Sequence, residues 1–414
     1  MQQNGWQAKP PLPRNGWCIL LMCIVSYDKR SVHALRKETL MTPRHFPPFH
    51  LERWFAEFEF VPGMRNLAAS CPFTVTTREL LELEDAETTA RYLSLNLDYI
   101  ENPGSESLRH AVAQLHTTLK ADDVRMTTGA NEALLLLIWT TVAPGDNIVV
   151  EEPCYDTVPG VAQALGIEVR RLPLRQEDGW KPDLEQLARL IDQQTRLVYL
   201  NHPHNPTGSQ LSKDEILAIA ELTEHAGATL VNDEVFRLIA LDGEPMPSIV
   251  DLVDHAVSIG DMTKPWGLGG LRVGWIASRQ HELLQRISAA RDYSTMCNSA
   301  PAAFLAELAL RHWKHVRAPR IAAARTNRDQ LAEAIMRSQG ALSWQRPQAG
   351  YTAFVQLPAH LSSSTFCRYL AQEKQLLLVP GQVYGNAYEH FFRIGFGCTP
   401  PLFQEGLTTI LAEL

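Results

Sequence analysis

Short apolar runs alternate with longer helical patterns through the middle of the chain, and this alternation constrains the fold more than any other feature. Helical patterns separate the successive runs. Strands that alternate with helices indicate βαβ units and a mainly parallel sheet. The runs are nearly continuous Val, Ile and Leu, as expected for strands covered on both faces. The predicted strands are residues 147–151, 168–173, 195–200, 229–232 and 256–259, and the predicted helices are 131–142, 158–165, 184–191 and 213–225.

The flanking sequence predicts a second, smaller domain. After residue 293 long helical stretches precede strands near 351–356 and 392–396, a pattern typical of an α+β unit. Helices are also predicted at residues 51–60 and 108–119. A chain of 414 residues exceeds what one hydrophobic core usually supports. The expected division is an extension at 1–40, an arm with part of the small domain at 41–98, a large domain at 99–295 and a C-terminal small domain at 296–414.

Residues 1–40 differ in composition from the rest of the chain. Nine apolar residues at 17–25 are too few to span a bilayer, which needs about 20. The run is similar to the apolar region of a signal peptide, but no small-x-small cleavage site follows it. We expect a dispensable extension, with translation able to begin at Met41. An export or membrane signal and an ordered arm remain alternatives.

Charge and cysteine usage exclude several protein classes. The chain has 38 Lys and Arg against 46 Asp and Glu, a net charge of −8, which argues against a nucleic-acid binder. Its seven cysteines form no CxxC pair, so we expect reduced thiols rather than a disulfide framework. Reduced thiols are typical of a cytoplasmic protein. We expect neither a metal site nor a stable membrane span.

Polar clusters follow successive predicted strands. The clusters lie at residues 201–208, 232–236 and 258–275, and a later strand carries a fourth at 392–396. In a mainly parallel sheet, ligands bind beyond the carboxyl ends of the strands. We therefore expect these side chains to surround one ligand site.

The ordered set Asn205, Asp233, Lys264, Arg272 and Arg393 resembles the class I/II aminotransferases, enzymes of fold type I that use pyridoxal 5′-phosphate (PLP). The resemblance extends over about residues 60–414. It implies an α/β fold, with a mainly parallel, seven-stranded sheet in the large domain and a smaller α+β domain. It also implies PLP as the cofactor.

The resemblance assigns a role to each member of this set. Lys264 would form a Schiff base with PLP and move the Cα proton of the substrate. Asp233 would keep the pyridine nitrogen protonated, and Asn205 would donate its amide to the 3′ oxygen. Arg272 would bind the phosphate, and Arg393 would clamp the substrate α-carboxylate, because a guanidinium binds such anions in a bidentate fork.

Further residues are assigned by the same resemblance. Gly129, Ala130 and Asn131 open a helix whose backbone N–H groups can bind the phosphate. Tyr155 would stack on the pyridine ring. Tyr99 would reach the phosphate of the neighbouring subunit, which implies a homodimer with shared active sites. The other candidates are Phe236, Asp261 and Thr263 at the cofactor, and Ser70 at the substrate together with Asn205 and Arg393.

Three positions depart from the family pattern. Phe236 stands where many relatives carry a Tyr that helps to hold the 3′ oxygen. Asp261 stands where many carry Ser near the phosphate, so its carboxylate should repel phosphate unless it is paired or turned away. Ser70 occupies the position of a usual glycine. These departures leave PLP binding in place but weaken the inference of plain transamination.

The expected reaction is transamination between an L-amino acid and a keto acid. Residues 51–54, 379–383 and 392–398 look similar to capreomycidine-synthase-like members, so an alternative is elimination and cyclisation, or oxidation, in arginine-derived metabolism. A PLP-sensing regulatory domain is a remote alternative. It would need an N-terminal DNA-binding domain, which forty residues of this composition cannot supply.

Overall fold

The structure, a computed structural model, describes residues 45–414. The predictions made for residues 1–40 lie outside this range. Short 3-10 helices occur at Ala121–Asp123, Ile249–Asp251, Gly269–Leu271, Gly381–Tyr384 and Asn386–Tyr388.

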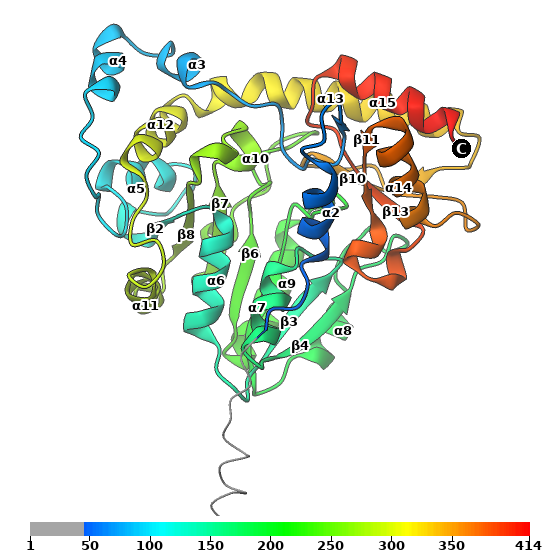
Figure 1. The fold of residues 1–414 in the computed structure, drawn as a ribbon. Helices are drawn as coiled ribbons and strands as arrows, with labels where there is room; N and C mark the ends of the chain where they lie inside the picture. The colour runs from blue at the N-terminus through cyan, green and yellow to red at the C-terminus, as the bar shows by residue number, and fades with distance from the viewer. Residues whose placement is uncertain (1–44) are drawn as a thin grey trace, which may run out of the picture. The chain divides into compact units, whose positions relative to one another are not determined.

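A seven-stranded sheet organises the larger part of the fold (Figure 1). Strand β8 runs antiparallel to both of its neighbours, and the other neighbouring pairs are parallel. The mainly parallel, seven-stranded sheet is therefore confirmed. In spatial order its strands are β2 (Val124–Thr127), β8 (Gly274–Ser278), β7 (Ala256–Asp261), β6 (Thr229–Asp233), β5 (Thr195–Leu200), β3 (Asn147–Glu152) and β4 (Glu168–Pro173).

Helices cover both faces of this sheet, which explains why its strands are apolar throughout. On β5, Leu197 and Tyr199 pack in one apolar cluster with helices α6, α7 and α11, whereas Val198 and Leu200 pack in another with α8 and α9. Successive side chains of a strand point to opposite faces, so each helical layer receives alternate residues. These helices are α6 (Ala130–Thr141), α7 (Thr157–Ala164), α8 (Leu184–Leu190), α9 (Lys213–Ala226) and α11 (His281–Arg291).

A third apolar cluster lies at the β2 edge of the sheet. There α3 (Thr77–Leu81), α5 (Glu106–Ala113) and α12 (Ala300–Arg311) pack with side chains of β2 and β8. Helix α4 (Ala86–Leu93) follows α3 in the same region (Figure 1).

A four-stranded antiparallel sheet forms the α+β part of the fold. Its order is β12-β13-β10-β9, and a short parallel pair joins β1 to β11. Trp54 and Phe58 attach helix α2 to the apolar cluster of this part. The smaller α+β unit is confirmed, whereas the division at residues 98/99 and 295/296 stays a prediction. The elements are α2 (His50–Phe58), β1 (Arg65–Asn66), α13 (Trp313–Arg337), β9 (Ser343–Trp344), β10 (Thr352–Gln356), α14 (Ser363–Lys374), β11 (Leu376–Leu377), β12 (Val379–Pro380), β13 (Phe391–Gly395) and α15 (Pro400–Ala412).

The carboxyl ends of the central strands carry the predicted polar residues. Asp233 is the last residue of β6 and Asp261 is the last residue of β7, and Asn201 directly follows β5. Lys264 lies in the short helix α10 (Thr263–Trp266), immediately after β7. Because these strands are parallel neighbours, their ends bring the polar residues to one edge of the sheet.

The described residues contain free thiols at Cys71, Cys154, Cys297, Cys367 and Cys398. Between residues 45 and 414 no helix is long and apolar enough to cross a membrane. No group of three or more potential metal ligands occurs in that range.

Candidate active site

A cavity of about 260 Å³ opens at this edge of the sheet, between the strand ends, the start of α6, helix α2 and strand β13. It gathers most of the residues predicted from the sequence. Those that line it are Ser70, Ala130, Asn131, Tyr155, Asn205, Asp233, Phe236, Asp261, Thr263, Lys264, Arg272 and Arg393.

Lys264 holds its amine in the cavity through two neighbouring side chains. Its Nζ lies 3.0 Å from Ser70 Oγ and 3.3 Å from Cys71 Sγ. The same nitrogen lies 5.8 Å from the centre of the Phe236 ring. The amine therefore has hydrogen-bonding partners on one side and an aromatic ring near it.

Asp261 is satisfied by backbone amides at the start of α10. Its Oδ1 accepts hydrogen bonds from the N–H groups of Thr263 at 2.9 Å and Lys264 at 3.4 Å. This pairing shapes the turn that presents Lys264. These two N–H donors also compensate the charge of the Asp261 carboxylate, which would otherwise repel a nearby phosphate.

Asp233 is a buried carboxyl group with two donors. Val235 N–H donates to Oδ1 at 3.1 Å, and the Tyr199 hydroxyl donates to Oδ2 at 3.2 Å. Burial, with a smaller contribution from the charge of Asp261, raises the pKa of Asp233 to about 7 despite these hydrogen bonds. A cation bound beside this carboxyl group would favour its ionised form.

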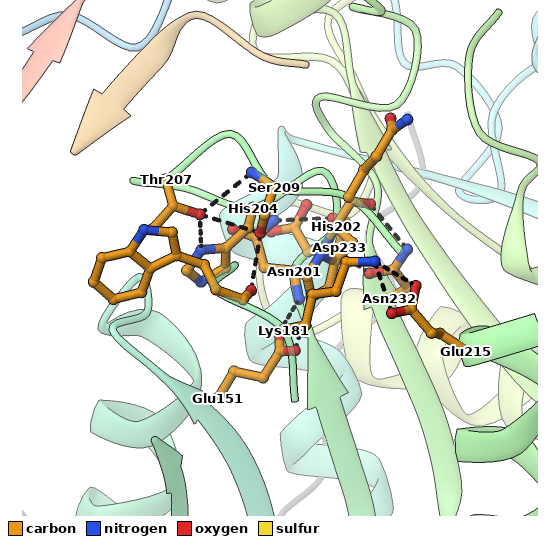
Figure 2. Close-up of polar contacts among 12 residues, drawn as sticks. Glu151, Lys181, Asn201, His202, His204, Thr207, Ser209, Glu215, Asn232 and Asp233 are labelled. Carbon is orange, nitrogen blue, oxygen red and sulfur yellow. Dashed lines mark hydrogen bonds and ion pairs between the residues drawn. The ribbon is translucent and has the colours of Figure 1, made fainter. Parts of the chain in front are cut away.

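A buried network fixes the loop that follows β5 (Figure 2). Asn201 Nδ2 donates to the Asp233 carbonyl at 3.0 Å, and Asn201 Oδ1 accepts from Asn205 N–H at 3.1 Å. Glu151 accepts from Asn201 N–H at 2.9 Å and pairs with His202 Nε2 at 2.8 Å. Burial opposes ionisation of Glu151, but His202 and the hydrogen bonds outweigh it and hold the pKa of Glu151 below its usual value. The loop thus places Asn205 and Asp233 relative to one another.

Three hydrogen bonds fix Arg393 in the wall of the cavity. Its Nη1 donates to Asn205 Oδ1 at 3.1 Å and to the Tyr384 hydroxyl at 2.8 Å, and its Nη2 donates to the Ala68 carbonyl at 2.8 Å. Because the oxygen of the Asn205 amide accepts from Arg393, the Nδ2 of that amide is left to donate to a ligand. The role predicted for Asn205, donation to the 3′ oxygen of the cofactor, stays a prediction.

Arg272 lies against the N-terminus of α6. A Cβ atom on Gly129, whose φ is +78°, would stand 2.5 Å from Arg272 Nη2. Gly129 does not line the cavity, but it lets the guanidinium approach the helix start. A guanidinium beside a helix N-terminus forms an anion site, because both carry positive charge and N–H donors.

Helix α2 and the residue after it contribute side chains that the sequence did not single out. Glu52, Phe55 and Glu59 line the cavity together with Cys71. The Tyr155 hydroxyl donates to Glu52 Oε1 at 3.0 Å. The signal in the sequence was their spacing of three and four residues, which puts them on one helical face. Glu52 also lies in the stretch 51–54 that looks similar to capreomycidine-synthase-like members, but no role was predicted for either carboxylate.

Tyr99 is not brought into the cavity of its own chain. Its side chain is 80% exposed and lines a separate hollow with Thr295 and Cys297. The role predicted for Tyr99 concerns the neighbouring subunit, and it stays a prediction.

The sequence model of the family described as aminotransferase class I and II matches residues 67–410. The chain belongs to this family. Capreomycidine synthase of Streptomyces vinaceus is 34% identical over 374 residues, which cover 90% of this chain and 95% of that protein. The match confirms the resemblance recognised in the sequence.

Solved structures show that this aminotransferase-family chain has the expected fold. A PLP-dependent aminotransferase from Streptococcus suis matches with a TM-score of 0.84 and 27% identity, over 89% of this chain and 97% of that one. The PLP-dependent cyclase OrfR matches with a TM-score of 0.81 and 30% identity, over 91% of this chain and 100% of that one.

The enzyme uses PLP, and the residues in the cavity fit that cofactor. Arg272 and the start of α6 offer an anion site of the kind that a phosphate needs. Burial raises the pKa of the Asp233 carboxyl group, and a protonated pyridine beside it would lower that pKa again. Lys264 supplies the primary amine.

Proposed function

We propose that this enzyme transfers the amino group of an L-amino acid to a keto acid, with Lys264 as the covalent anchor of PLP and the carrier of the substrate proton. One observation supports this above the others. The amine of Lys264, the carboxyl group of Asp233 and the guanidinium of Arg393 line a single cavity.

Substrate binding would rest on Arg393. Its guanidinium is held by Asn205, Tyr384 and Ala68, so it is ordered before a substrate carboxylate arrives. Such preorganisation lowers the entropic cost of binding and fixes the orientation of Cα. When bound, PLP supplies an electron sink for charge that develops on Cα.

Proton transfer would rest on Lys264. Its Nζ takes the proton from the substrate Cα, while Ser70 Oγ and Cys71 Sγ orient the amine. A general base must lie within hydrogen-bonding reach of the proton it removes, and these two partners limit where Nζ can stand.

A second candidate function is elimination followed by ring closure. Phe236 lies beside Lys264 and offers no hydroxyl to the cavity. The chain is also similar to a capreomycidine synthase and a PLP-dependent cyclase. This reaction would use the same proton transfer by Lys264 but would release no keto acid.

We also propose a homodimer that works in amino-acid metabolism in the cytoplasm. The exposure of Tyr99 outside its own cavity supports a shared active site. The free thiols of the described cysteines support a reducing compartment.

Borohydride reduction of the purified holoenzyme, followed by peptide mass analysis, tests the anchor. The cofactor should be fixed to the peptide that carries Lys264, and Lys264→Ala should abolish the adduct. Lys213→Ala, on the exposed start of α9, is the matched control and should keep it. An adduct on another lysine would refute the assignment.

Product analysis separates the two reactions. Purified holoenzyme is mixed with each of a panel of amino acids, with and without a keto acid. The products are then identified from their masses by mass spectrometry. Transamination gives a keto acid from the amino acid. A product that retains its nitrogen and gains a ring would favour the second candidate instead.

A further inference from the structure

Helix α2 and the residue that follows it, Glu59, present two carboxylates to the active-site cavity. Glu52 and Glu59 are seven residues apart, and Phe55 lies between them on the same face of the helix. Both carboxylates are half-buried. The Tyr155 hydroxyl donates to Glu52 at 3.0 Å, and Asn66 Nδ2 donates to Glu59 at 3.4 Å.

No cationic side chain among the described residues forms an ion pair with either carboxylate, although the charge of Lys264 acts weakly on Glu59. In the described range, 45–414, no ion pair within 4.0 Å includes Glu52 or Glu59. Burial, together with the charge of Glu52, raises the pKa of Glu59 above its usual value. Two half-buried carboxylates in one cavity repel one another, and a cation placed between them would remove that cost.

The other charged groups of the cavity have assigned partners. Arg272 would bind the phosphate, and Asp233 would pair with the pyridine nitrogen. Lys264 would be bonded to the cofactor, and Asp261 is held by backbone amides. The α2 carboxylates therefore remain available to the substrate.

Arg393 independently indicates a ligand at this place. Its side chain is 1% exposed and lines the same cavity, and its Nε has no hydrogen-bond partner among residues 45–414. Its guanidinium carbon lies 5.8 Å from the centre of the Phe55 ring. The group that would bind a carboxylate thus lies next to the helical face that would bind a cation.

We propose that Glu52 and Glu59 recognise a cationic side chain of the amino-acid substrate, either a guanidinium or an ammonium group. This inference rests on the proposed function, in which Arg393 binds the α-carboxylate. An amino acid with a cation on its side chain complements both Arg393, which would bind its α-carboxylate, and the two carboxylates beside Phe55. A neutral side chain leaves the carboxylates unpaired, and an acidic one adds repulsion.

Equilibrium binding to the holoenzyme tests the proposal. Calorimetry and cofactor absorbance are followed with L-arginine against its neutral analogue L-citrulline, and with L-lysine against L-norleucine. At least one cationic member should bind about tenfold or more tightly than its neutral match, as a charge-assisted contact predicts. The pair that shows the larger ratio identifies guanidinium or ammonium as the preferred cation.

Variants on α2 locate the effect. Glu59→Gln and the double variant Glu52→Gln/Glu59→Gln should reduce the cation preference toward unity and weaken its dependence on salt. Glu57→Gln, on the exposed side of the same helix, is the matched control and should keep the preference. The comparison of cationic and neutral ligands on the unaltered enzyme needs no variant, so a poorly folding double variant does not remove the test.

Two results would overturn the proposal. One is equal binding of cationic and neutral partners by the unaltered enzyme, and the other is a cation preference that survives in the double variant. Either result leaves transamination intact if a keto acid is formed. Tight binding of arginine or lysine without keto acid formation would instead refute transamination and support the recognition site.

Discussion

Asp233 carries a carboxyl group whose proton affinity depends on what binds beside it. Burial raises its pKa from 3.8 to about 7 in the folded chain. At a pH between these values the cofactor-free native state holds a proton that the unfolded state has lost. Its contribution to stability is therefore fully present below pH 3.8 and is lost as the pH rises from that value through about 7.

Urea unfolding of the cofactor-free protein between pH 4.5 and 8 measures this dependence. Asp233→Asn should remove much of the decline in the free energy of unfolding with rising pH, and addition of PLP to the unaltered protein should flatten it. Asp178→Asn, at an exposed position, should keep the decline. An identical slope in the Asp233 variant would contradict the assignment of the raised pKa.

Phe236 should affect the protonation of the Schiff base on Lys264. A hydroxyl that donates to the 3′ oxygen stabilises the anion of that oxygen and lowers the pKa of the linked nitrogen. Phe236 lacks this donor, so Phe236→Tyr should lower the pKa of the Schiff-base nitrogen on Lys264. The proton affinity of that nitrogen should fall up to about tenfold. A spectrophotometric pH titration without substrate measures it, and Phe60→Tyr, at a site 88% exposed, is the control. A higher pKa in the Phe236 variant would contradict the argument.

The chemistry of single residues was the part of the site most readily predicted. Asn205, Asp233, Lys264, Arg272 and Arg393 follow strands or turns in a fixed order, and the structure brings all five to one cavity. PLP chemistry requires these residue types, so their order in the sequence is informative.

Elements that form through distant packing were harder to predict. Helix α2 was expected as a helix, but its place beside the cavity depends on Trp54 and Phe58 packing against residues more than 300 positions later.

Strand β2 was missed in the sequence because its four residues, with Arg125 among them, carry too little hydrophobic periodicity. The helix expected to reach residue 119 ends at Ala113, since the N–H groups of Thr117 and Thr118 bond to Asp251 instead.

The turn before α6 carries a prediction of its own. Gly129→Ala would place a Cβ 2.5 Å from Arg272 Nη2 and displace the guanidinium from the helix start. The affinity for PLP should fall about tenfold or more, because a charged hydrogen-bonding group leaves its place. Equilibrium titration of the cofactor-free protein with PLP measures the loss.

Gly166→Ala is the matched control for this turn. Gly166 has a φ of +77° and nothing within 4 Å of its added Cβ, so it reproduces the backbone strain without the contact. Equal losses of PLP affinity in the two variants would show that strain, not the displaced Arg272, is responsible.

At the scale of the whole molecule, Tyr99 does not line the active-site cavity of its own chain. The side chain is 80% exposed, in a hollow apart from the cavity. If two copies share their sites, Tyr99 of one chain completes the site that holds Lys264 of the other. The sequence alone could predict such sharing only through the family resemblance, because contacts between copies leave no periodic pattern in one chain.

Mixing two inactive variants tests whether the sites are shared. Lys264→Ala lacks the anchor, and Tyr99→Ala should bind PLP weakly because the phosphate loses a donor. A hybrid of the two chains combines the Lys264 of one with the Tyr99 of the other in a single intact site. After unfolding and refolding together, the mixture should recover about a quarter of the unaltered activity, since random pairing makes half the dimers hybrids with one good site each. Activity no higher than the sum of the separate variants would mean that Tyr99 does not serve the partner's site.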